Sequence, residues 1–149
     1  MKNYSRFYKC VYFKIQELVD PETYASMGEN AWSLFDTTLL STLDRIRDRY
    51  KVPITINNWN NKIPNPFKYR GFRPASYTAG APLSMHRVGK AIDFDVAGMK
   101  AEQVRKDILA NPEHLDFMFI SRIEMAVNWC HIDVANVPTR IQTFSKVAA

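Results

Sequence analysis

Two short segments, far apart in the chain, constrain the fold most, and the first is an acidic strand preceded by a histidine. Residues 91–96, Ala-Ile-Asp-Phe-Asp-Val, alternate strictly between apolar and polar side chains. A strand with this pattern carries Asp93 and Asp95 on one face. His86 stands seven positions before Asp93. Gly89 lies between them and allows the close turn that brings the imidazole back over the acidic face.

The second segment, residues 129–134, brings another histidine to an alternating strand pattern, Trp-Cys-His-Ile-Asp-Val. Alternation puts His131 on the same face as Trp129 and Asp133, whereas Cys130 points to the opposite face. Cys130 is therefore expected to be a buried, inert thiol and not a metal ligand.

His86, Asp93 and His131 together offer two imidazoles and one carboxylate. Zinc held by three protein ligands keeps a fourth position for water, and this donor set recurs at catalytic zinc sites. Such an ion lowers the pKa of its water and polarises a carbonyl. A single histidine is more often structural, so the prediction depends on both segments. His114, in Asn-Pro-Glu-His-Leu, has no such context and is interpreted as a surface residue.

A longer motif runs through both segments: Ser84-x-His86-x-x-Gly89-x-Ala91-x-Asp93, followed by Trp129-x-His131-x-Asp133. It resembles the zinc D-Ala-D-Ala carboxypeptidase family, which includes phage L-Ala-D-Glu endolysins and shares its fold with the hedgehog signalling domain. The resemblance covers about residues 53–134. It implies that the two histidines and Asp93 bind zinc, and that the substrate is a peptide stem of bacterial peptidoglycan.

The expected fold is α+β, with one domain over residues 1–149. A small, mainly antiparallel sheet carries the metal face and helices pack behind it, as in the hedgehog/DD-peptidase fold. Residues 30–50 predict the longest helix, because apolar side chains recur at steps of three or four. We interpret this stripe as core packing: Trp32, Phe35, Leu39, Leu43, Ile46 and Tyr50.

Shorter elements complete the prediction. Asp20 and Pro21 are typical of a helix start, and Gly28 soon ends that helix. A helix over residues 100–111 packs through Val104, Ile108 and Leu109. The other expected segments are strands at residues 53–58, 117–124 and 129–134, an N-terminal arm at residues 1–28 and a C-terminal tail at residues 138–149.

The long loop before Ser84 is rich in proline and glycine, and such loops between packed elements are more often functional than idle. By the resemblance, Gly71-Phe72-Arg73 matches a Gly-x-Arg element near the substrate. Arg73 is then expected to bind a substrate carboxylate through its planar guanidinium. Arg70 is a close alternative. Ser84 is expected to form a local hydrogen bond or to contact the substrate.

A hydrolytic zinc site needs a general base beside the water. In several branches of the resembled family this base is an acidic residue three positions before the last histidine. That position is Asn128 here, which has no proton to exchange at neutral pH. We predict Glu124 as the replacement. If residues 125–128 close a hairpin, symmetric pairing sets Glu124 opposite Trp129 and on the face of His131.

The alternative for Glu124 is a structural ion pair with Arg122 or Lys90. Asp133 and Asp95 are interpreted as hydrogen-bond acceptors that fix the orientation of the ligand imidazoles.

Composition limits the classes of protein that remain. The 46% hydrophobic and 23% charged residues are ordinary for a globular domain and exclude extensive disorder. The net charge of +5 favours acidic partners, but no nucleic-acid motif or basic run is present. No apolar stretch approaches the ~20 residues that span a bilayer. Lys9 and Lys14 interrupt the only apolar N-terminal run, so a signal peptide is not expected.

The expected function is zinc-dependent hydrolysis of an amide bond in peptidoglycan stem peptides, by a carboxypeptidase or an endopeptidase. The enzyme is expected to be a monomer, made in the cytoplasm, that reaches the wall as a phage lysin or in a virion. The alternative is a non-catalytic, zinc-containing module that binds cell wall or protein, which Asn128 favours. A second alternative is a basic nucleic-acid-associated protein with structural zinc, whose affinity would fall steeply with salt.

Overall fold

The structure, a computed structural model, describes residues 7–137 and 140–146. Its strands form one five-stranded sheet in the order β1-β2-β4-β3-β5. Neighbouring strands are antiparallel except β3 and β5, which are parallel. The strands are β1 (Ile54–Thr55), β2 (Ala91–Val96), β3 (Arg122–Glu124), β4 (Cys130–Asp133) and β5 (Gln142–Phe144). This arrangement confirms the expected single α+β domain with a small, mainly antiparallel sheet.

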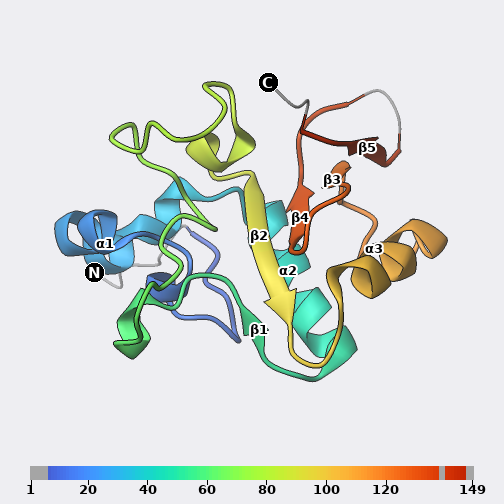
Figure 1. The fold of residues 1–149 in the computed structure, drawn as a ribbon, viewed down its shortest axis with the longest axis horizontal. Helices are drawn as coiled ribbons and strands as arrows, with labels where there is room; N and C mark the ends of the chain where they lie inside the picture. Colours follow the sequence, from blue (N-terminus) through green and yellow to red (C-terminus); the bar gives the residue numbers. More distant parts are fainter. Residues whose placement is uncertain (1–6, 138–139, 147–149) are drawn as a thin grey trace, which may run out of the picture.

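Of the α-helices among the described residues, the second and the third pack against the apolar face of the sheet. The α-helices are α1 (Pro21–Met27), α2 (Thr37–Tyr50) and α3 (Ala101–Ala110). Figure 1 shows α2 behind β2 and β4, and α3 beside β4. One core joins α2 to the sheet and buries apolar side chains from both layers: Leu39, Leu43, Ile46, Ile92, Phe94 and Ile132. Strand alternation therefore leaves Asp93 and His131 on the face that α2 does not cover.

The expected helix over residues 30–50 is wrong in its first part. Residues Gly28–Leu34 form a 3-10 helix instead, and Phe35 is extended. The α-helix begins only at Thr37, because the Asp36 side chain accepts a hydrogen bond from the backbone N–H of Thr38 and caps it. Trp32 is nevertheless 4% exposed. The interpretation of the apolar stripe as core packing is therefore confirmed.

The two flanking helices agree better with their sequence signals. The Asp20 carboxylate caps α1 by accepting from the backbone N–H groups of Glu22 and Thr23, and the helix ends at Gly28. In α3, Val104 and Ile108 are buried as expected, whereas Leu109 is 39% exposed and does not join the core.

The outer strands are shorter or lie elsewhere than expected. Of residues 53–58, only Ile54–Thr55 pair, and of residues 117–124 only Arg122–Glu124 form a strand. The C-terminal segment, expected as a tail, contributes β5. Residues 138–139 and 147–149 of that tail lie outside the described residues.

The N-terminal arm is irregular where it is described, and residues 1–6 lie outside the described part. It is fixed to α2 by the buried Asp44 carboxylate, which accepts from the Tyr8 hydroxyl and from the backbone N–H groups of Val11 and Tyr12. In the described residues, no helix has the length and apolar character that crossing a bilayer requires.

Two glycines allow loops to pass close to the N-terminal half of the chain. A Cβ at Gly71 would lie 1.9 Å from the backbone oxygen of Leu18, and one at Gly89 would lie 1.8 Å from that of Leu34. Gly89 also has a φ of +67°. Both positions therefore require glycine, and both hold the segments that carry the candidate site.

Gly89→Ala is expected to lower the free energy of unfolding by about 2–5 kcal/mol, since it combines left-handed strain with a backbone clash. Gly98→Ala is the matched control, because Gly98 has a φ of +76° but nothing within 4 Å of the added Cβ. The control is expected to lose only about 1–2 kcal/mol. Urea denaturation measures both, and equal losses would contradict the close approach at Leu34.

Candidate metal centre

His86 is presented by a tight turn that the sequence encodes locally. The turn is the 3-10 helix Met85–Val88, in which the Ser84 hydroxyl accepts from the backbone N–H of His86 and Gly89 closes the C-terminal end. The local hydrogen bond expected for Ser84 is thus present. His86 is only 2% exposed, and its backbone oxygen accepts from the N–H of Arg73. The turn therefore holds the imidazole in a buried position next to the segment that carries Arg73.

The two ring nitrogens of His86 have different partners. Nδ1 lies 2.8 Å from the backbone oxygen of Gly71, and Nε2 lies 3.3 Å from Oδ1 of Asp93. A carbonyl oxygen only accepts hydrogen bonds, so we assign the proton to Nδ1. Nε2 then has a free lone pair that faces Asp93.

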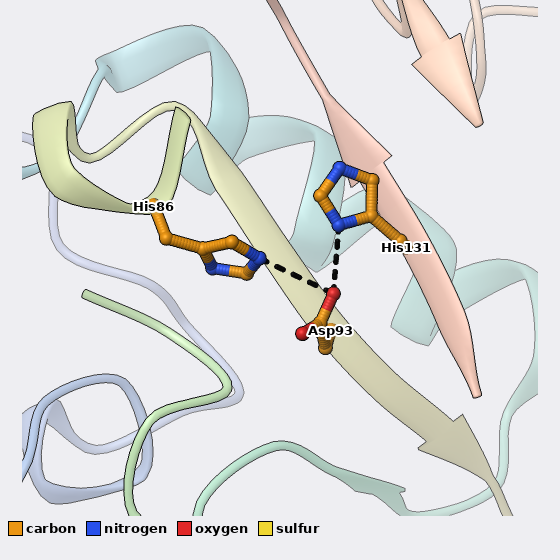
Figure 2. A group of neighbouring side chains, drawn as sticks. All are labelled: His86, Asp93 and His131. Carbon is orange, nitrogen blue, oxygen red and sulfur yellow. Dashed lines mark hydrogen bonds and ion pairs between the residues drawn. The ribbon is translucent and has the colours of Figure 1, made fainter. Parts of the chain in front are cut away.

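His131 meets Asp93 across the β2–β4 ladder. Asp93 and His131 are directly paired in this antiparallel register. Nδ1 of His131 lies 2.7 Å from Oδ1 of Asp93, and Nε2 lies 3.1 Å from Oδ2 of Asp133. Figure 2 shows both imidazoles converging on the same Asp93 oxygen, one from the turn before β2 and the other from β4. Nδ1 of His131 thus faces the same point in space as Nε2 of His86.

The predicted ligand set is therefore assembled in space. One donor atom from each of His86, Asp93 and His131 lies within 4.8 Å of the other two, and all three residues are buried. Two imidazole nitrogens and a carboxylate oxygen match the donor types and number that a catalytic zinc site uses. This group can hold a metal ion with a position left open.

Without an ion, the charges of the group already favour a cation. Burial opposes the ionised form of Asp93, but the interactions with His131 and His86 outweigh it and hold the pKa of Asp93 well below its usual range. Burial likewise acts against the charged form of His131, yet hydrogen bonds to Asp133 and Asp93 raise its pKa to about 9. For His86, burial prevails and lowers the pKa. A metal cation can replace the proton that lies between His131 and Asp93.

Asp133 supports His131 from behind, as expected. Its carboxylate is fully buried and forms an ion pair with Arg122, with Nη2 2.8 Å from Oδ2. The acceptor at Asp133 directs the Nε2 proton of His131 away from the cluster, which leaves Nδ1 for a metal. The same role expected for Asp95 is wrong, because Asp95 pairs with Arg70 and not with an imidazole.

Arg73 reaches the site but is partly engaged by the protein itself. Its Nη2 lies 3.0 Å from Oδ2 of Asp93, and its Nε donates to the backbone oxygen of Tyr69. Arg70 lies 3.6 Å above the ring of Phe67 in addition to pairing with Asp95. Of the two arginines considered, only Arg73 lines the hollow that contains the candidate ligands.

That hollow has a volume of about 280 Å³. It contains the three candidate ligands and the residues predicted to act on substrate: Arg73, Ser84 and Glu124. Its wall also includes residues to which the sequence assigned no role at the site: Arg122, Trp129, Phe144 and Lys146.

Glu124 lies in this hollow with an unpaired buried oxygen. The residue is 4% exposed and its Oε1 has no hydrogen-bond partner. Among the described residues it makes no ion pair with Arg122 or Lys90, so the structural alternative is not supported. Arg122 pairs with Asp133 in the β3–β4 ladder, and this register places Glu124 opposite His131. The prediction that Glu124 lies opposite Trp129 is therefore wrong by two residues. The prediction that Glu124 lies on the same face of the sheet as His131 is right.

Other residues considered from the sequence lie away from the site. Asn128 is exposed and lines a separate hollow with Cys130. Burial raises the pKa of the Cys130 thiol to about 12, as expected of an inert cysteine. His114 is exposed and contacts only Asp116 among acidic residues described.

The residues that sequence reasoning missed differ in how visible they were. Arg122 shares the alternation of Glu124 and could have been placed on the same face. Phe144 and Lys146 lie in a segment whose strand pairing only the tertiary structure reveals.

The α+β fold thus carries a buried group of two histidines and one carboxylate, which is the donor set of a catalytic zinc site. A model of the family described as Peptidase M15 matches residues 11–133. The chain therefore belongs to the peptidase M15 family, whose members are zinc-dependent. Searches of curated proteins and of solved structures each gave no significant match.

His86→Ala is expected to abolish stoichiometric zinc binding, because it removes one of three donors. Loss of a residue that only hydrogen-bonds to a metal ligand lowers metal affinity by up to about 100-fold. Loss of a ligand itself should lower the affinity for zinc by more than this. His114→Ala is the matched control and should retain one zinc per chain. Metal content after dialysis, measured by mass spectrometry, decides; full retention of zinc by His86→Ala would contradict the assigned ligand set.

Asp133→Asn is expected to weaken zinc binding by about 10–100-fold, since Asn no longer fixes the His131 tautomer as a carboxylate does. Asp95→Asn removes a carboxylate that contacts no imidazole and should leave the affinity unchanged. Competition with a fluorescent zinc chelator measures both variants. Equal losses would show that net charge, and not the contact to His131, sets the affinity.

Proposed function

We propose that the protein hydrolyses an amide bond in the stem peptides of bacterial peptidoglycan, with zinc bound by His86, Asp93 and His131. Membership of the peptidase M15 family supports a zinc metallopeptidase that acts on peptidoglycan. The observation that carries the catalytic part of the proposal is the buried, unpaired Oε1 of Glu124 in the same hollow.

Glu124 is the general base in this proposal. When bound, zinc supplies a Lewis acid that polarises the amide carbonyl and lowers the pKa of a water. Glu124 accepts the proton of the attacking water through its free oxygen and passes it to the departing amine nitrogen. Its position opposite His131 puts the carboxylate next to a ligand without making it a ligand. The adjacent strand thus supplies the carboxylate that Asn128 cannot.

Arg73 and Ser84 act on the substrate side. Two of the three guanidinium nitrogens of Arg73 are engaged by Asp93 and Tyr69, so the remaining Nη1 is the donor that faces a substrate carboxylate. This gives Arg73 two tasks, because it also orients the ligand Asp93. The Ser84 hydroxyl keeps its own proton to donate to substrate, since it acts as an acceptor toward His86.

The setting belongs to the same proposal. A monomer that is released by a lysing phage or carried in a virion would reach the wall, and the basic charge of +5 suits an anionic polymer. Both a carboxypeptidase and an endopeptidase are compatible with this ligand set.

The second candidate is a zinc-containing module that binds the wall without hydrolysis, which Asn128 at the usual acidic position favours. The unpaired Glu124 favours hydrolysis, because a buried carboxylate with no structural partner costs stability unless it has another use.

Glu124→Gln is expected to lower the rate of stem-peptide cleavage by about 10²–10⁴-fold, since glutamine cannot accept the proton of water. Zinc content should not change. Digestion of purified peptidoglycan, with and without chelator and followed by mass analysis of the released fragments, measures the rate and identifies the bond.

Glu22→Gln, an exposed change on α1, is the control and should retain full activity. A Glu124→Gln protein as active as the control would exclude Glu124 as the base. Wild-type protein that holds one zinc, binds the wall and releases no fragment would favour the binding module instead.

A further inference from the structure

The C-terminal strand lies beyond the region that defines the family, yet it forms one wall of the metal hollow. The family match ends at residue 133, whereas β5 spans Gln142–Phe144. Glu124 of β3 pairs with Phe144 of β5, and the backbone N–H of Met125 donates to the Phe144 oxygen. Phe144 and Lys146 both line the hollow. The wall that these two residues form therefore lies outside the part of the chain that the family model matches.

Phe144 fixes the segment against the candidate ligands. Its ring meets that of His131 edge to face, with centroids 5.3 Å apart and planes at 87°. The guanidinium of Arg122 lies 5.1 Å from the centre of the same ring. These contacts are favourable for an aromatic ring, and they hold the backbone that leads to Lys146.

Lys146, two residues beyond Phe144, also lines the hollow. Its ammonium nitrogen lies 5.7 Å from the centre of the Trp129 ring. The indole Nε1 of Trp129 is buried and has no hydrogen-bond partner among the described residues. Both residues thus line the hollow, and neither donor group has a hydrogen-bond acceptor among the described residues.

The other cations of the hollow are already paired. Arg73 binds Asp93, and Arg122 binds Asp133. Within residues 7–137 and 140–146, Lys146 has no carboxylate partner, and its contact with Trp129 leaves its charge uncompensated. An anionic group of the substrate could form the ion pair that Lys146 does not form within the protein.

We propose that Lys146 and the Trp129 indole N–H form a carboxylate subsite that selects stem peptides with a free carboxylate over those with a carboxamide there. This inference rests on the proposed function, since it assumes a stem-peptide substrate. Both groups are pure donors, and a carboxylate accepts from both. A carboxamide has only one acceptor oxygen, and its NH₂ group would have to face one of the two donors. A peptide with a carboxamide at this position should therefore bind more weakly than one with a carboxylate.

The test compares synthetic stem pentapeptides in which one carboxylate at a time is replaced by a carboxamide. Binding is measured by calorimetry on zinc-loaded Glu124→Gln protein, which preserves the peptides, with and without Lys146→Met. One amidation should weaken binding about tenfold when Lys146 is present, as expected for one charge-assisted hydrogen bond. Lys146→Met should remove that preference, weakening only the peptide with the free carboxylate.

Two further variants separate a direct contact from a general effect. Lys146→Arg should restore the preference. Lys106→Met, which removes the same charge from the exposed side of α3, should leave it intact. The preference should also shrink as salt is added, because an exposed ammonium is screened.

The outcomes distinguish this inference from the proposed hydrolysis. Equal binding of all peptides, binding of none, or preferences that are all unchanged in Lys146→Met would overturn the subsite, whereas a preference due to Arg73 should persist in that variant. A preference that depends on Lys146 in a wild-type protein that cleaves nothing would retain the subsite and reject the hydrolase. Metal-dependent cleavage with no effect of Lys146→Met on the preference would retain the hydrolase and reject the subsite.

Discussion

The register between β2 and β4 is the constraint on which the site depends. It sets Asp93 directly opposite His131 and Ile92 opposite Ile132. Because side chains alternate across a strand, a slip of one residue would turn His131 into the core and Ile132 toward the candidate metal site. The buried pairs on the α2 side therefore hold the histidine and the carboxylate together on the other side. Packing of the apolar pair Ile92 and Ile132 on one face of the sheet thus fixes how Asp93 and His131 lie relative to each other on the other face.

The third candidate ligand, His86, comes from outside the sheet, and its position depends on close backbone approach. Gly89 lets the turn carrying His86 pass against Leu34, and Gly71 lets the preceding loop pass against Leu18. The Gly71 oxygen then accepts from His86 Nδ1. The same two glycines thus serve packing and tautomer selection. A loop without them could not bring the imidazole to Asp93 without displacing the N-terminal half of the chain.

Sequence reasoning succeeded where the signal is local. Alternation predicts β2 residue for residue, and strand parity alone places Glu124 on the His131 face. It failed where tertiary contacts decide. The apolar stripe continues through residues 30–50, but the cap at Asp36 starts a new helix within it. Periodicity alone does not show that the helix is interrupted there. The short strand β5 depends on pairing with β3, and its own residues are too few to show a pattern.

Glu124, the candidate base, occupies a more restricted position on the backbone than Asn128 does. Asn128 stands in the connection that leads into β4, and it faces another hollow. Glu124 stands within β3, where the ladders to β4 and β5 on its two sides restrict the backbone. An unpaired buried carboxylate oxygen costs about 1–3 kcal/mol, and a strand between two neighbours cannot relax to relieve it. In the proposed mechanism the sheet would hold this oxygen in place to accept a proton, at a cost in stability that a loop residue would avoid by turning to solvent.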